Sequence, residues 1–135
     1  MKIMTARHLL FIDDNEDSRT LVKFALESKS DWKVLTACNG VKGIATAETE
    51  RPDVILLDFM MPYLNGLVVL DILKSNSFTC SIPVILFTAM VQADLLSQLE
   101  NTSAIGVITK PFDIISLDSQ IAQICKWNSN TAIIS

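Results

Sequence analysis

The sequence has only three cysteines among its 135 residues, and an odd number of cysteines cannot all pair. Cys38, Cys80 and Cys125 lie far apart, which excludes a disulfide framework and a C-x-x-C zinc motif built from them. Unpaired cysteines are typical of a reducing compartment. We therefore expect reduced thiols and a cytoplasmic location.

Long apolar runs and clusters of basic residues are also missing. No run approaches the roughly 20 apolar residues of a membrane-spanning helix, and residues 1–7 are not followed by the apolar region of a signal peptide. The 11 Lys and Arg residues are scattered and outnumbered by 15 Asp and Glu, which gives a net charge of −4. Such a chain has no electrostatic footprint for nucleic acid. We expect neither a membrane nor a nucleic acid as its partner.

Four short apolar runs are present instead, and each ends in a polar residue that can do chemistry. Continuous apolar runs of strand length, separated by helical periodicity, are typical of a parallel sheet covered on both faces. The carboxyl ends of parallel strands meet at one edge of the sheet, where open α/β folds bind ligands. The runs are 9–12 followed by Asp13 and Asp14, 54–57 followed by Asp58, 83–87 followed by Thr88, and 105–108 followed by Thr109 and Lys110.

The whole pattern predicts five βα units in an α/β domain that is doubly wound around a parallel sheet. A less apolar run at 34–37 predicts an edge strand. Helices are expected at about 19–28, 41–48, 67–75 and 93–100, and a last helix after Asp113. Asp113 is predicted to cap that last helix, with Ile114, Leu117, Ile121 and Ile124 on its buried face. At this length one domain is expected, which we place at 1–127, with a C-terminal tail at 128–135.

Three carboxylates at one edge of a sheet would repel one another unless a cation compensated them. Mg²⁺ suits a shallow site of this kind, because it binds few protein oxygens and keeps several waters. Lys110 adds an ammonium and Thr88 a hydroxyl, and the three kinds of group together could cradle a phosphoryl group. A carboxylate can act as a nucleophile, so Asp58 could carry that group as an aspartyl phosphate.

These residues resemble the receiver domains of bacterial two-component response regulators, over residues 8–127. One matching motif would be weak support, whereas four motifs in order, each after its expected strand, are strong support. The resemblance implies a flavodoxin-like (βα)5 fold with strand order 2-1-3-4-5 and a cis peptide bond before Pro111. The motifs are Ile12-Asp13-Asp14, Leu57-Asp58-Phe59-Met60-Met61-Pro62, Thr88-Ala89 and Lys110-Pro111-Phe112.

The resemblance also implies how such a chain would act. Asp58 would accept a phosphoryl group from a sensor histidine kinase, a phosphotransfer protein or a small phosphodonor. Thr88 and Lys110 would contact the phosphoryl oxygens. The chain would be a stand-alone receiver that catalyses only its own phosphorylation and dephosphorylation, and it would signal through contact with a downstream protein.

A Mg²⁺ site follows from the same resemblance. Asp14 and Asp58 would bind the ion directly, together with the backbone carbonyl of Met60. Asp13 would act through a metal-bound water.

Three other positions bear on how this chain would switch. Val107 stands where many receivers have Tyr or Phe, so no aromatic ring can rotate there after phosphorylation. Met60 and Met90 occupy positions that flank the path of attacking water in the family. Because a thioether sulfur is only a weak hydrogen-bond acceptor, we expect slow hydrolysis of phosphorylated Asp58.

Three alternatives remain open, and each fits the sequence less well. A pseudo-receiver that binds partners without phosphorylation would not need the complete set of acidic residues, Thr88 and Lys110. A small phosphatase with an Asp nucleophile typically has an acid two residues later, where this chain has Met60. A flavodoxin-type cofactor binder would need a Gly-rich or Ser/Thr-rich phosphate loop after the first strand. Each site residue alone could be a capping, turn or solvated residue, but together they would require four coincidences.

Overall fold

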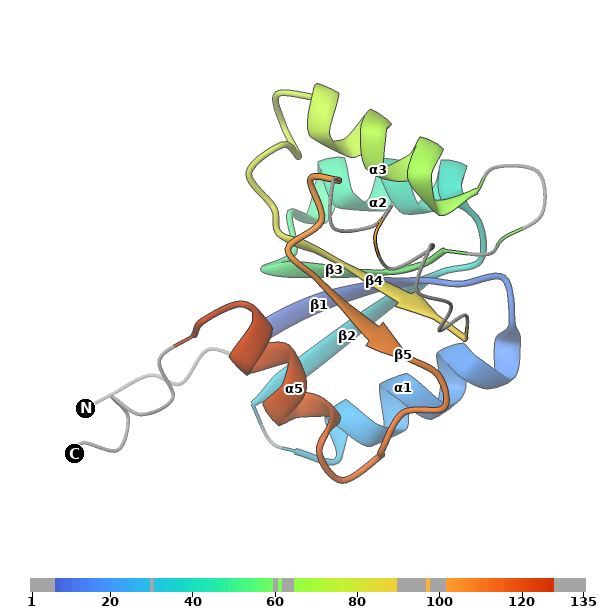
Figure 1. The fold of residues 1–135 in the computed structure, drawn as a ribbon, viewed down its shortest axis with the longest axis vertical. Helices are drawn as coiled ribbons and strands as arrows, with labels where there is room; N and C mark the ends of the chain where they lie inside the picture. The colour runs from blue at the N-terminus through green and yellow to red at the C-terminus, as the bar shows by residue number, and fades with distance from the viewer. Residues whose placement is uncertain are drawn as a thin grey trace.

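The computed structural model describes residues 7–29, 31–59, 61, 65–89, 97 and 102–127. Within them strands and helices alternate along the chain (Figure 1). The helix predicted at 93–100 lies outside the described residues, apart from residue 97, and so does the tail at 128–135. The elements are β1 (Arg7–Ile12), α1 (Glu16–Glu27), β2 (Trp32–Ala37), α2 (Gly40–Glu50), β3 (Val54–Asp58), α3 (Gly66–Ser75), β4 (Val84–Thr88), β5 (Gly106–Thr109) and α5 (Leu117–Ile124).

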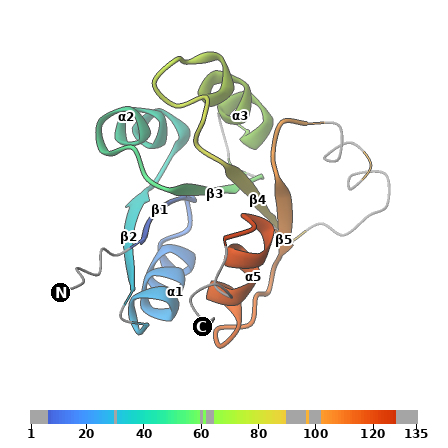
Figure 2. The same ribbon diagram turned by 90° about the vertical axis from the view of Figure 1, so that its left-hand side faces the viewer.

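The five strands form one parallel sheet in the order β2-β1-β3-β4-β5. This order confirms the flavodoxin-like topology, and it places β2 at an edge as its weaker apolar character predicted. Helices α2 and α3 cover one face of the sheet, and α1 and α5 cover the other (Figure 2). Because the strands are parallel and in register, their carboxyl ends lie along one edge.

Alternate strand residues supply two separate cores, one on each face of the sheet. Leu10 and Ile12 of β1 pack beneath α2 and α3, whereas Leu9 and Phe11 pack against α1 and α5, and all four are fully buried. Each such side chain contributes about 1.5–3 kcal/mol of transfer free energy. The period of two along β1 and the helices on both faces explain why these runs are apolar without interruption.

Asparagine caps begin three of the helices. The side chains of Asn15, Asn39 and Asn65 each accept a hydrogen bond from the backbone N–H three residues later. Such caps satisfy donors that the first turn of a helix leaves without a partner. The cap at Asn15 starts α1 at Glu16, which is earlier than the helical period alone indicated.

The prediction for the last helix was wrong at its start. Asp113 does not cap it: its Oδ1 accepts a hydrogen bond from the N–H of Ile115 and closes a local turn. The helix α5 begins only at Leu117, after Ser116. Leu117 and Ile121 are buried as predicted, but Ile114 precedes the helix and is 40% exposed. A short polar side chain can cap a helix or close a turn with the same geometry, and the sequence does not distinguish the two.

Trp32 at the start of β2 and Arg7 at the start of β1 both contact Trp127, which follows α5. The ring centroids of Trp32 and Trp127 lie 5.8 Å apart, and the Arg7 guanidinium lies 3.9 Å from the centroid of the Trp127 ring. Nearby, burial raises the pKa of the Cys125 thiol to about 11. All three cysteines are free thiols, in agreement with the sequence analysis. Among the described residues, no helix is long and apolar enough to cross a bilayer.

An ion pair from α1 covers the outer edge of β2 at Val34. Glu27 Oε2 accepts the Val34 N–H at 2.9 Å, and Lys23 Nζ donates to the Val34 carbonyl at 3.0 Å. Lys23 and Glu27 also contact each other at 3.0 Å. The N–H of Val34 holds the pKa of the Glu27 carboxyl below its usual range, with the nearby Lys23 acting in the same direction. Edge strands with unpaired backbone groups invite association, and this pair covers those of Val34.

Replacing the Glu27 carboxylate should remove a pH-dependent part of the stability. Since the folded-state pKa lies below the unfolded value of about 4.3, this contribution is present above that value and is lost as the pH falls through the folded pKa. Glu27→Gln should cost about 1 kcal/mol at neutral pH, because a charged acceptor of the Val34 N–H is lost from a partly solvated site. Denaturant unfolding from pH 7 to pH 3 measures both effects, with Glu50→Gln as a control. The prediction would be contradicted if the free energy of unfolding changed with pH in the same way in wild type and in Glu27→Gln.

Candidate functional site

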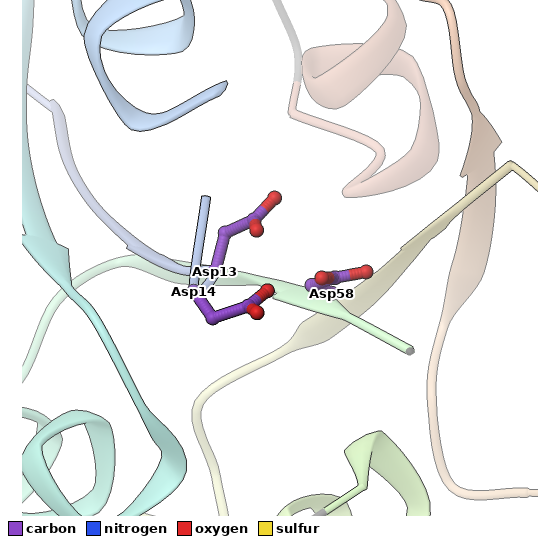
Figure 3. A group of neighbouring side chains, drawn as sticks. All are labelled: Asp13, Asp14 and Asp58. Carbon is purple, nitrogen blue, oxygen red and sulfur yellow. The ribbon is translucent and has the colours of Figure 1, made fainter. Parts of the chain in front are cut away.

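Three aspartates gather where β1 and β3 end (Figure 3). Asp13 and Asp14 follow β1, and Asp58 is the last residue of β3. One carboxylate oxygen from each lies within 4.8 Å of the others. Asp13 is fully buried and Asp58 is 3% exposed, whereas Asp14 is exposed. The neighbouring positions of β1 and β3 in the sheet bring together residues that are far apart in the sequence, as predicted.

Lys110 bridges the two buried carboxylates. Its Nζ lies 3.1 Å from Asp13 Oδ2 and 3.5 Å from Asp58 Oδ1. The residue is held in place by its backbone N–H, which donates to the Thr88 carbonyl at 2.8 Å, and the Lys110–Pro111 peptide bond is cis as expected. A buried carboxylate is costly unless it is paired, so this ammonium compensates charge that the fold places out of water.

Asp13 is held by hydrogen bonds on three sides. Its Oδ1 accepts the N–H of Asn15 at 2.9 Å, and its own N–H donates to the Ala37 carbonyl. Its carbonyl accepts a hydrogen bond from Arg19 Nη1 at 2.8 Å. Arg19 is not among the site residues predicted from the sequence. The sequence feature that could have indicated this residue is a cation in the first turn of a helix. Because the helix dipole disfavours positive charge there, the side chain is expected to have a partner outside the helix.

Gly66 lies unusually close to the backbone of Asp58. A Cβ atom at Gly66 would lie 2.8 Å from the Asp58 carbonyl oxygen and 2.7 Å from Phe59 Cα. The N–H of Gly66 donates to the Phe59 carbonyl at 3.0 Å. The helix predicted at 67–75 begins just after this glycine, but the sequence alone did not connect the glycine with Asp58. Only a residue without a side chain lets α3 begin so close to the end of β3.

Two other predicted positions lie on the neighbouring strands β4 and β5. Thr88 is fully buried at the end of β4, next to Phe87, which pairs with Asp58 in the sheet. Val107 lies in β5, partly buried against the core beneath α2 and α3, so no aromatic side chain occupies this position. Met60 and Met90 lie outside the described residues.

The donor set fits a hard divalent cation. All three groups offer carboxylate oxygens, which Mg²⁺ prefers. Oxygen atoms bound to one Mg²⁺ at 2.0–2.1 Å can be at most about 4.2 Å apart, so a spread of up to 4.8 Å requires only small side-chain movements. Asp13, Asp14 and Asp58 could therefore share one ion, directly or through water.

Comparison with known proteins agrees with this geometry. The model of the family described as "Response regulator receiver domain" matches residues 9–122. The chain belongs to this family. Receiver domains are phosphoacceptor signalling domains of two-component systems rather than enzymes in the ordinary sense, and the five-stranded sheet with strand order 2-1-3-4-5 is their fold.

Two curated response regulators and one solved structure illustrate the likeness. The DNA-binding dual master transcriptional regulator RpaA of Synechocystis is 37% identical over 78% of this chain and 44% of its own length. The response regulator PleD of Caulobacter vibrioides is 35% identical over 92% of this chain and 27% of its own length. The receiver domain therefore spans less than half the length of these two relatives. The chemotaxis protein CheY4 of Vibrio cholerae has the same fold, with a TM-score of 0.82 at 24% identity, over 89% of this chain and 99% of that structure.

Gly66→Ala should displace the end of β3 and with it the Asp58 carboxylate. The new methyl group would meet backbone atoms, which cannot rotate away as a side chain can. We expect a loss of stability of about 1–3 kcal/mol and a changed amide chemical shift at Asp58 and Phe59. Thermal unfolding and ¹H–¹⁵N spectra measure the two effects. Gly43→Ala is a useful comparison, because the three atoms nearest to its methyl group would all belong to the Ile12 side chain and not to the backbone.

Proposed function

We propose that this receiver domain is a phosphorylation-dependent switch in which Asp58 accepts the phosphoryl group. The observation that carries the proposal is the bridging position of Lys110, 3.1 Å from Asp13 and 3.5 Å from Asp58. It puts a cation beside a nearly buried carboxylate at the edge of the sheet where the three aspartates can bind a second cation. A dianionic donor can approach this carboxylate only if its negative surroundings are neutralised.

The proposed reaction uses these groups as follows. An Oδ atom of Asp58 forms a bond to phosphorus, the bond from phosphorus to the donor breaks, and the donor atom keeps the electron pair. Lys110 and the Thr88 hydroxyl then donate hydrogen bonds to the transferred phosphoryl oxygens. Asp14, Asp58 and the Met60 carbonyl would hold Mg²⁺, with Asp13 acting through water, and the ion would supply positive charge beside the phosphoryl group.

The partners follow from this role and from the family. The phosphodonor is a sensor histidine kinase, a phosphotransfer protein or a small phosphate ester or anhydride, and the output is contact with a downstream protein. The domain, placed at residues 1–127, catalyses only its own phosphorylation and dephosphorylation. With a net charge of −4 it is not proposed to bind nucleic acid. Its free cysteines favour the cytoplasm.

Asp58 should gain one phosphoryl group from acetyl phosphate only when Mg²⁺ is present. Without a cation, the acidic residues around Asp58 repel the donor. Intact mass spectrometry with and without EDTA measures the modification, and Asp58→Asn should abolish it. Lys110→Ala is the second comparison: it should retain Mg²⁺ binding through the aspartates but be phosphorylated more slowly. A mass gain that persists in Asp58→Asn, or that does not depend on Mg²⁺, would show that the assignment is wrong.

The phosphorylated state should decay slowly, because Met60 and Met90 offer no strong hydrogen-bonding group to the attacking water. Loss of water positioning is expected to slow hydrolysis by about tenfold, a small part of what orientation can contribute. The decay of phosphorylated Asp58 should therefore be faster in Met60→Asn, in Met90→Glu, and most clearly in the double variant. Equal decay rates in wild type and all three variants would refute the role of the two methionines.

A further inference from the structure

The Asp14 carboxylate is the least restrained member of the acidic cluster. Asp13 is held by Lys110 and by the N–H of Asn15, and Asp58 is nearly buried at the end of β3. Asp14, in contrast, is exposed, and its carboxylate makes no hydrogen bond or ion pair within the described ranges. Something other than contacts of its own side chain must therefore direct it toward Asp58.

The peptide that joins Asp13 to Asp14 provides that control. A peptide unit is planar, so the direction of the Asp13 carbonyl sets the plane on which the Asp14 backbone is built. One hydrogen bond holds the peptide before this unit, and another holds the unit itself. The Asp13 N–H donates to Ala37 of the neighbouring strand, and the Asp13 carbonyl accepts from Arg19 Nη1 at 2.8 Å. Turning the carbonyl would turn the Cα–Cβ bond of Asp14 away from the cluster.

Arg19 is well suited to hold this carbonyl. It is half-buried on α1, and within the described residues it has no carboxylate partner that would compete for its guanidinium. The planar guanidinium offers several donors in a rigid fork, so little side-chain freedom is lost for each hydrogen bond that it makes. The helix dipole disfavours a cation in the first turn of α1. The position of Arg19 is therefore consistent with a role in holding the Asp13 carbonyl and not with a role in stabilising the helix.

We propose that Arg19 is a positioning residue: by holding the Asp13–Asp14 peptide it directs the Asp14 carboxylate to bind a divalent cation together with Asp58. The inference rests on the proposed function, because it assumes that the acidic cluster binds Mg²⁺. It also assigns a task to a residue that touches neither the ion nor the phosphoryl group.

A role of Arg19 through its charge and a role in positioning Asp14 predict opposite changes in Mg²⁺ affinity when Arg19 is neutralised. If only the charge mattered, Arg19→Gln would remove a positive charge near the site and would tighten Mg²⁺ binding. If Arg19 positions Asp14, the same substitution frees the peptide and weakens binding. Substitutions of residues that orient metal ligands typically cost 10–100-fold in affinity. Since Asp14 is one ligand of several, we expect a loss of about tenfold for Arg19→Gln.

Lys42→Gln is the matched control. Lys42 lines the same cavity between α1, β2 and α2 as Arg19 does, and its replacement removes the same charge. In the described part of the chain, its side chain forms no ion pair with the acidic cluster. Lys42→Gln should leave the Mg²⁺ affinity unchanged or slightly increased. Arg19→Lys keeps the charge but loses the guanidinium fork, and it should bind Mg²⁺ more weakly than wild type.

The measurement is a Mg²⁺ titration of the unphosphorylated proteins, followed through the backbone amides of Asp14 and Phe59 in ¹H–¹⁵N spectra. The Asp14 amide should already be shifted in the metal-free Arg19→Gln protein and unshifted in Lys42→Gln. Equal or tighter Mg²⁺ binding by Arg19→Gln, while wild type binds, would overturn the positioning role and leave the proposed function standing. A wild type that shows no saturable Mg²⁺ binding would overturn the proposed function, and the positioning role with it. If Arg19→Gln does not fold, the Mg²⁺ affinity of Arg19→Lys relative to wild type tests the positioning role in the same way.

Discussion

The rest of the site depends on one ammonium group between two buried carboxylates. Asp13 is fully buried and Asp58 nearly so, and two such charges side by side would be strongly destabilising without a partner. Lys110 comes from the far edge strand of the sheet and reaches both of them. One side chain therefore joins the end of β5 to the ends of β1 and β3, across the end of β4, where its Nζ lies 5.0 Å from the centroid of the Phe87 ring.

The strand order makes this arrangement possible. Because β1 and β3 are neighbours at the centre of the sheet, the residues that follow or end them are brought together although nearly a third of the chain separates them. The central strands are buried on both faces, so the carboxylates at their ends stand on rigid, well-packed supports. A site built on strand ends is held more precisely than one built on loops. Gly66 extends the same principle, since it lets α3 begin against the Asp58 backbone.

What could be predicted from the sequence follows from repeating patterns. Continuous apolar runs indicated the buried parallel strands, and the polar residues after them indicated where Asp58 and Lys110 would meet. The start of α5 could not be predicted, because Asp113 forms the same short-range hydrogen bond in a turn as in a cap. The roles of Arg19 and Gly66 were also missed. Each depends on a close contact between the start of a helix and the chain just before it, with the Asp13 carbonyl in one case and the Asp58 carbonyl in the other. The hydrophobic periodicity that indicated the strands and helices does not specify such contacts.

Lys110 cannot meet two demands at the same time. In the present structure its ammonium compensates Asp13 and Asp58. In the proposed phosphorylated state the same ammonium would donate to the phosphoryl oxygens, and Asp13 would lose part of its neutralisation just as negative charge is added beside it. A divalent cation bound by Asp14 and Asp58 would offset that loss. The cation is therefore expected to matter more after phosphorylation than before it. In the proposed switch, Lys110 would change partners on phosphorylation, and such a change would not require an aromatic ring at the position of Val107.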